Sequence, residues 1–122
     1  TSAVEASQPI VVLISEDPRA SHRANEALRI ALGIVAGENE LTVILAGPAV
    51  HLLDSDTDDL VDGEDIARHR AALRKLGVPF HVEKSAIPSA GDGWNEERLP
   101  FVPVSGEEIA GLMARGRSFI VF

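Results

Sequence analysis

The chain has 122 residues, no cysteine and a formal net charge of −8. This length suits one domain with a single core. The acidic balance argues against a nucleic-acid partner, because Lys and Arg neutralise the phosphates in such complexes. No apolar run approaches the roughly 20 residues that span a bilayer, so we expect no membrane partner. Without cysteine, the chain forms no disulfide, thiolate metal site or thiol nucleophile.

The first eight residues differ in composition from the rest of the chain. TSAVEASQ has neither the basic start nor the apolar core of a signal peptide. We therefore predict a flexible tail over residues 1–8, a single domain over residues 9–122, and a cytoplasmic location.

The first part of this domain predicts a strand, a helix and a second strand. Pro9 to Ile14 is an apolar run rich in β-branched residues, as in a strand buried on both faces. Asp17 is a suitable N-cap for a helix that continues to about Val35, and alanines at helical spacing predict its close approach to the sheet. Leu41 to Ala46 is the second buried strand. No hairpin turn joins the strands, so they are expected to be parallel.

The alternation continues to the end of the chain. The further predicted elements are a helix from Gly63 to Leu76, a strand from Val78 to Val82, a strand from Phe101 to Val104, a helix that opens with the capping-box pair Ser105 and Glu108, and a strand from Ser118 to Phe122. Pro103 assigns its strand to a sheet edge or strand end, and residues 85–98 read mainly as loop. The sequence thus predicts an α/β fold: three α/β/α layers with a mostly parallel sheet of about five strands.

Three segments resemble one known family. ALRIAL followed by LTVILAGPAVHLL, then LRKLGVPFHV, and the terminal SFIVF look like consecutive elements of the DsrE/DsrF-like family. Some members of this family relay sulfur as a cysteine persulfide, and the family commonly assembles as trimers or hexamers. The resemblance therefore implies a homo-oligomer, or a hetero-oligomer with a cysteine-bearing homologue.

The resemblance breaks at the reactive residue. In sulfur-carrying members the cysteine lies just beyond the third strand, and a loose alignment puts Glu83 near that position. Persulfide transfer needs a polarizable thiolate, which a carboxylate cannot replace. Persulfide transfer by this chain alone is therefore excluded. The chain is most similar to cysteine-less members that act as structural subunits.

Polar residues follow the first three predicted strands. Ligands of open parallel sheets bind beyond the carboxyl ends of strands, and the residues selected as a candidate cleft are Ser15, Glu16, Gly47, His51, Glu83 and Lys84. In the functional interpretation, Glu16, His51 and Glu83 are polar anchors for a small molecule. The simpler interpretation keeps them as a solvated loop and a short amphipathic turn.

Two other features have a functional and a simpler interpretation. Asp54, Asp56 and Asp58 follow an EF-hand spacing, but Asp59 replaces its glycine, so an acidic solvated loop is preferred to a metal site. Trp94, in a loop bracketed by glycines, is predicted at a subunit interface in preference to a lid over the cleft.

The second long predicted helix contains a cluster of basic residues. The basic residues Arg68, Arg70, Arg74 and Lys75 of the second long helix are predicted to form a solvated face. No Walker loop, dinucleotide fingerprint or nucleophile elbow is present, so we expect no cofactor.

Three functions remain open. The first is a non-catalytic structural or accessory subunit of a sulfur-relay assembly. The second is a homo-oligomeric small-molecule-binding protein that uses the candidate cleft. The third is an enzyme with Glu83 as general base, which lacks a visible nucleophile or oriented partner.

Overall fold

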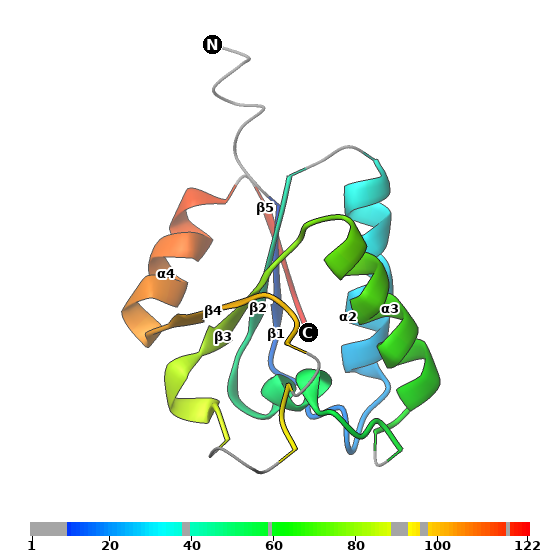
Figure 1. The fold of residues 1–122 in the computed structure, drawn as a ribbon. Coiled ribbons are helices and arrows are strands. Elements are labelled where there is room, and N and C mark those ends of the chain that lie inside the picture. Colours follow the sequence, from blue (N-terminus) through cyan, green and yellow to red (C-terminus); the bar gives the residue numbers. More distant parts are fainter. Residues whose placement is uncertain (1–9, 38–39, 59, 89–92, 96–97, 117) are drawn as a thin grey trace.

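The computed structural model describes residues 10–37, 40–58, 60–88, 93–95, 98–116 and 118–122. Five parallel strands form one sheet in the order β4-β3-β2-β1-β5 (Figure 1). The strands are β1 (Ile10–Ile14), β2 (Leu41–Leu45), β3 (Phe80–Glu83), β4 (Phe101–Val104) and β5 (Ser118–Val121). The predicted tail over residues 1–8 lies outside the described residues.

Three α-helices connect these strands: α2 (Arg23–Ala36), α3 (Gly63–Lys75) and α4 (Gly106–Arg115). Two short 3₁₀ helices, η1 (Gly47–Leu53) and η2 (Lys84–Ala86), follow β2 and β3. The chain steps in one direction from β1 to β2 to β3, so right-handed crossovers put α2 and α3 on the same face. The connection from β4 to β5 crosses the sheet in the opposite direction, and α4 lies on the other face (Figure 1). The predicted three-layer α/β/α fold is confirmed.

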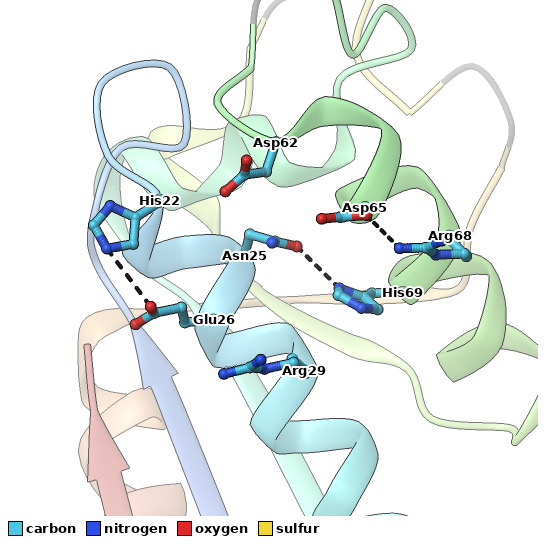
Figure 2. Close-up of a pocket in the computed structure, with 8 residues that line it drawn as sticks. All are labelled: His22, Asn25, Glu26, Arg29, Asp62, Asp65, Arg68 and His69. Carbon is cyan, nitrogen blue, oxygen red and sulfur yellow. Dashed lines mark hydrogen bonds and ion pairs between the residues drawn. The ribbon is translucent and has the colours of Figure 1, made fainter.

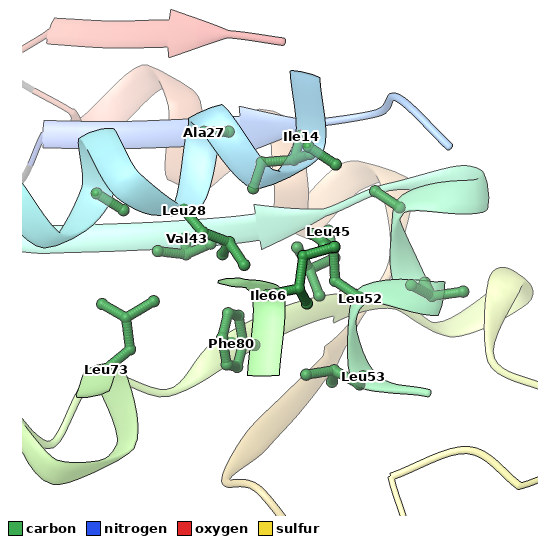
Figure 3. Packing of buried hydrophobic residues seen from close by; sticks show 14 of the residues in the cluster. Ile14, Ala27, Leu28, Val43, Leu45, Leu52, Leu53, Ile66, Leu73 and Phe80 are labelled. Atoms are coloured by element: carbon green, nitrogen blue, oxygen red, sulfur yellow. The ribbon is translucent and has the colours of Figure 1, made fainter. Parts of the chain in front are cut away.

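The main core lies between the sheet and the helices α2 and α3. Register pairs Val12 of β1 with Val43 of β2, and Val43 with Phe80 of β3, so all three point to this face. Ala27 and Leu28 of α2 are fully buried against them (Figure 3). The alanines let α2 approach the sheet closely, as the sequence predicted. Each fully buried Val, Leu or Phe contributes about 1.5–3 kcal/mol relative to exposure.

The first helix begins later than predicted. Asp17 does not cap a helix; its carboxylate accepts the backbone N–H and the guanidinium N–H groups of Arg19 in a local turn. Its carbonyl accepts the N–H groups of Ala20 and Ser21, at 3.1 and 3.0 Å. The helix α2 therefore starts only at Arg23. Asp17 therefore forms a turn with the residues that follow it, which is a common alternative to helix capping for aspartate.

The third strand also begins later than the predicted Val78. Gly77, with a φ of 75°, and Val78 end α3 in a Schellman motif, in which their N–H groups bond the carbonyls of Arg74 and Leu73 at 3.1 and 3.0 Å. The strand β3 starts after Pro79, at Phe80. The other predicted cap is present as expected: Ser105 and Glu108 form a complete capping box at α4.

Candidate functional site

The predicted cleft residues lie where β1, β2 and β3 end. Ser15, directly after β1, is used structurally: its N–H and Oγ both bond the carbonyl oxygen of Phe122, at 2.7 and 3.0 Å. Glu16 is half-buried, and its side chain makes no hydrogen bond or ion pair within the described ranges. Ser15 thus connects the loop after β1 to the residue that follows β5. The side chain of Glu16 has no such structural contact in the described ranges.

Glu83 and Gly47 are brought together from separate loops. The Gly47 N–H donates to Glu83 Oε1 at 3.0 Å. Gly47 has a φ of 54°, which glycine adopts readily, and this turns its N–H toward the carboxylate at the end of β3. Both residues are partly buried. The carboxylate therefore fixes the start of η1 with a charge-assisted hydrogen bond.

Lys84 extends from the same loop toward α4. Its Nζ lies 3.8 Å from Glu108 Oε1, and both side chains are more than half exposed. An ion pair of this exposure contributes little stability. Lys84 thus points to the α4 side of the sheet and connects the loop after β3 with the start of that helix.

His51 belongs to a cluster of four charged or titratable side chains. Its Nδ1 lies 3.0 and 3.2 Å from the two carboxylate oxygens of Asp54. Asp17 forms a bidentate pair with Arg19, and this hydrogen bonding holds the pKa of Asp17 below its ordinary value against the opposing effect of burial; His51 contributes in the same direction. The pKa of Arg19 is raised mainly by Asp17, with Asp54 adding to it. Arg19 was not among the residues selected from the sequence, because its place in this cluster depends on the turn that Asp17 forms.

Arg70 is a second residue that sequence reasoning missed. It was predicted on a solvated face, but its side chain is only 2% exposed. Its Nη1 donates to the carbonyls of Leu52 and Asp54, at 2.9 and 2.7 Å. The signal was available: Arg70 lies four residues after Ile66 and three before Leu73, and both are fully buried. Through these two hydrogen bonds, Arg70 anchors the end of η1.

Trp94 also contacts η1 and its flank. Its indole Nε1–H donates to the Val50 carbonyl at 2.7 Å, and its ring meets Phe101 edge-on with centroids 5.1 Å apart. A single bridge joins its backbone to that of Asp54. The chain itself therefore provides the contacts of this half-buried side chain. A role for Trp94 at a subunit interface stays a prediction.

The acidic segment after η1 uses its carboxylates locally. Asp54 pairs with His51, and Asp56 Oδ1 accepts the N–H of Asp58 at 2.9 Å. Asp59 lies outside the described residues. Across the described ranges, no three His, Asp or Glu side chains are grouped closely enough to hold a metal ion.

A polar pocket of about 390 Å³ lies between α2 and α3 (Figure 2). The residues that line it are His22, Asn25, Glu26, Arg29, Asp62, Asp65, Arg68 and His69. His69 Nδ1 lies 2.9 Å from Asn25 Oδ1, and burial lowers the pKa of His69. Arg68 pairs with Asp65, and His22 with Glu26. No pattern in the sequence joined these two helices, since their contact depends on the tertiary fold.

Comparison with known proteins identifies the family of this chain. A profile of the DsrE/DsrF-like family matches residues 8–122. The chain belongs to the DsrE/DsrF-like family. The crystal structure of the YchN protein from E. coli is similar in fold, with a TM-score of 0.72 and 20% sequence identity over 94% of this chain and 99% of that one. No curated protein sequence matches this DsrE/DsrF-like chain.

Two properties of this DsrE/DsrF-like chain limit its chemistry. It has no cysteine, and the last residue of β3 is Glu83, whose carboxylate is bonded to Gly47. Within the part of the chain that the structure describes, no helix is long and apolar enough to cross a membrane. The site at the strand ends therefore offers carboxylates, an imidazole and a guanidinium, but no group that can bond sulfur covalently.

Proposed function

We propose that this chain is a non-catalytic structural or accessory subunit, serving in a sulfur-relay assembly whose thiol belongs to another chain. The observation that carries the proposal is the pairing of Glu83 with Gly47. At the end of β3, near the position that the resemblance assigns to the reactive cysteine, this chain has a carboxylate in a structural hydrogen bond. Such a group orders a loop but cannot accept or donate sulfane sulfur.

Other contacts at the site hold the surface around η1 rigid. Arg70 and Trp94 each hold η1 by a hydrogen bond to its backbone. A loop fixed in this way can present a constant surface to a partner, because little conformational entropy is lost on binding. We expect this partner to be a cysteine-bearing homologue. The two chains would form a hetero-oligomer, or copies of this chain would form a trimer or hexamer that binds the homologue.

Two measurements test this proposal. Native mass spectrometry of the complex isolated from its own cells should give a mixed assembly that contains a cysteine-bearing chain. In a transfer assay with ³⁵S-labelled persulfide donor, label should appear on that partner and never on this chain. Recovery of this chain without any thiol-bearing partner would contradict the proposal.

The second candidate is a homo-oligomeric small-molecule-binding protein. The observation that favours it is the cluster of Asp17, Arg19, His51 and Asp54, which brings ionisable groups from two loops to the strand ends. Glu16 directly precedes Asp17 in sequence. Glu83 bonds the N–H of Gly47, the first residue of the 3₁₀ helix that contains His51. A polar ligand would therefore meet both signs of charge. Native mass spectrometry should then show a homo-oligomer with a stoichiometric added mass. Its loss in His51→Ala, but not in the surface control Lys75→Ala, would identify this site.

A further inference from the structure

The polar pocket between α2 and α3 has no part in the site at the strand ends (Figure 2). On each side, lining residues lie at the i, i+3 and i+7 spacing of one helix face. They are His22, Asn25 and Arg29 on the α2 side and Asp62, Asp65 and His69 on the α3 side, together with Glu26 and Arg68. The volume of about 390 Å³ falls within the range of small-molecule sites. Two helices thus present polar faces to a space of ligand size.

Two side chains inside the pocket keep unused hydrogen-bonding groups. Asn25 is only 8% exposed, and its Oδ1 lies 2.9 Å from His69 Nδ1. An amide oxygen only accepts, so this bond places the proton of the neutral imidazole on Nδ1 and leaves Nε2 as an acceptor. In the described part of the chain, Asn25 Nδ2 and His69 Nε2 make no hydrogen bond. Buried polar groups are normally paired, so this donor and this acceptor are available to a ligand.

The rim of the pocket offers one free charge of each sign. Arg29 and Asp62 are exposed, and neither makes a hydrogen bond or ion pair within the described ranges. The other charged residues of the pocket pair with one another. Figure 2 shows Arg29 and Asp62 at opposite ends of the pocket, with Asn25 and His69 between them. A ligand that fills this space therefore meets a cation at one end and an anion at the other.

This arrangement disfavours simple ions. A phosphate or sulfate near Arg29 would also face the carboxylates of Glu26, Asp62 and Asp65. A simple organic cation would face the guanidinium groups of Arg29 and Arg68. Among the described residues, no group of three His, Asp or Glu side chains could hold a metal ion. A molecule that carries both charges at separate ends is the chemistry that fits.

We infer that the pocket between α2 and α3 binds a small zwitterion with a free ammonium and a free carboxylate, as in an amino acid or a dipeptide. The guanidinium of Arg29 pairs with the ligand carboxylate, which also accepts a hydrogen bond from Asn25 Nδ2. The carboxylate of Asp62 pairs with the ligand ammonium, which also donates to His69 Nε2. This binding is independent of the proposed subunit role, because none of these residues belongs to the site at the strand ends.

The test is isothermal titration calorimetry of the full chain with the standard free amino acids and with their glycyl dipeptides. At least one probe should bind with a stoichiometry of one ligand per chain. Its N-acetyl derivative and its carboxamide should each bind about tenfold more weakly or worse, because each lacks one of the two charged ends. The tighter of the two probe classes identifies the source of the ligand as a free amino acid or a short peptide.

Two exposed substitutions test the two ends of the pocket. Arg29→Gln and Asp62→Asn should each weaken binding by about tenfold or more, and asparagine tolerates the positive φ of 59° at the second position. The matched controls Arg23→Gln and Glu64→Gln, at exposed residues that do not line the pocket, should bind as the wild type does. The N-acetyl derivative should lose nothing further in Asp62→Asn, and the carboxamide nothing further in Arg29→Gln. Circular dichroism of each variant shows that the fold is retained.

Three outcomes would overturn the inference. They are the absence of binding by every probe, capped derivatives that bind as tightly as their parents, and unchanged affinity in both pocket variants. Binding that is lost in His51→Ala but retained in Arg29→Gln and Asp62→Asn would also overturn it, and would assign the ligand to the strand ends. The experiment uses this chain alone, so its failure is distinct from failure to find a mixed assembly in cells.

Discussion

At the scale of single residues, two buried or half-buried polar side chains organise the strand ends. Glu83 and Arg70 both bond backbone groups of η1 or its flanks, at distances from 2.7 to 3.0 Å. Neither is exposed enough to be read as a solvated charge. Their effect is to hold a 3₁₀ segment, which has poorer hydrogen-bond geometry than an α-helix. Substitutions at these residues should therefore mainly lower the free energy of unfolding.

The first prediction concerns Glu83. Glu83→Ala should lower the free energy of unfolding by about 1–2 kcal/mol, because the partly buried Gly47 N–H loses its acceptor. Glu83→Gln keeps an amide oxygen at the same reach and should cost less. Urea denaturation followed by far-UV circular dichroism measures both. Glu16→Ala, which removes a carboxylate without a hydrogen bond, is the control and should change little; equal losses at the two positions would contradict this role for Glu83.

The second prediction concerns Arg70. Arg70→Met keeps the apolar stem but leaves the carbonyls of Leu52 and Asp54 without their donor, and we expect a loss of about 2–4 kcal/mol. Trp94 pairs with the backbone of Asp54, whose carbonyl Arg70 bonds, so the fluorescence of Trp94 should also change before global unfolding. The exposed Lys75→Met is the comparison variant and should leave both readouts near wild type. A stable Arg70→Met protein with unchanged Trp94 emission would refute the anchoring role.

At the scale of elements, the starts of helices depend on close backbone contacts. A Cβ on Gly63, the first residue of α3, would lie 2.0 Å from the carbonyl oxygen of Thr57. The acidic segment before α3 thus folds directly over the helix start. A Cβ on Gly33, inside α2, would meet nothing within 4 Å. The same residue type therefore has opposite roles in the two helices.

This contrast gives the third prediction. Gly63→Ala should destabilise the protein by more than about 2 kcal/mol, since backbone atoms must move to relieve the overlap. Gly33→Ala should stabilise it by about 0.5–1 kcal/mol, because alanine loses less backbone entropy in a helix. Midpoints of urea unfolding compare the two variants directly. A shift of the same sign in both would show that the contact with Thr57 is not tight.

Elements were predictable where the pattern is local. The apolar runs of β1 and β2, Gly77 as the end of α3 and the capping box at Ser105 were all readable from neighbouring residues. The start of α2 was not, because the turn at Asp17 competes with the cap that the same residue could form. The surroundings of Arg70 and the pairing of Glu83 with Gly47 were also beyond local patterns. They depend on loops that the sheet brings together from 16 to 36 positions apart in sequence.

At the scale of the whole molecule, each side of the sheet contains a partly buried histidine whose pKa is lowered by burial. His81 of β3 lies on the α4 face. Burial lowers its pKa from the ordinary 6.5, and a backbone hydrogen bond with Val43 opposes this. Its Nδ1 is buried and finds no partner in the described ranges. His81, Glu108 and Arg115 line one groove beside α4. On the other face, His69 also has a lowered pKa, again through burial.

These two histidines predict how stability depends on pH. The folded state binds their protons less readily than the unfolded state, whose histidines titrate near the ordinary value of 6.5. The stability of the neutral form is therefore fully present above pH 6.5 and is lost as the pH falls through the lower folded-state pKa values. Asp17 adds a separate loss below its ordinary value of 3.8. Urea midpoints measured between pH 7.5 and 4.5 should fall with pH, and His81→Gln should flatten this slope. His22→Gln, at an exposed position, should retain the wild-type slope, and a slope unchanged by His81→Gln would assign the acid sensitivity to other groups.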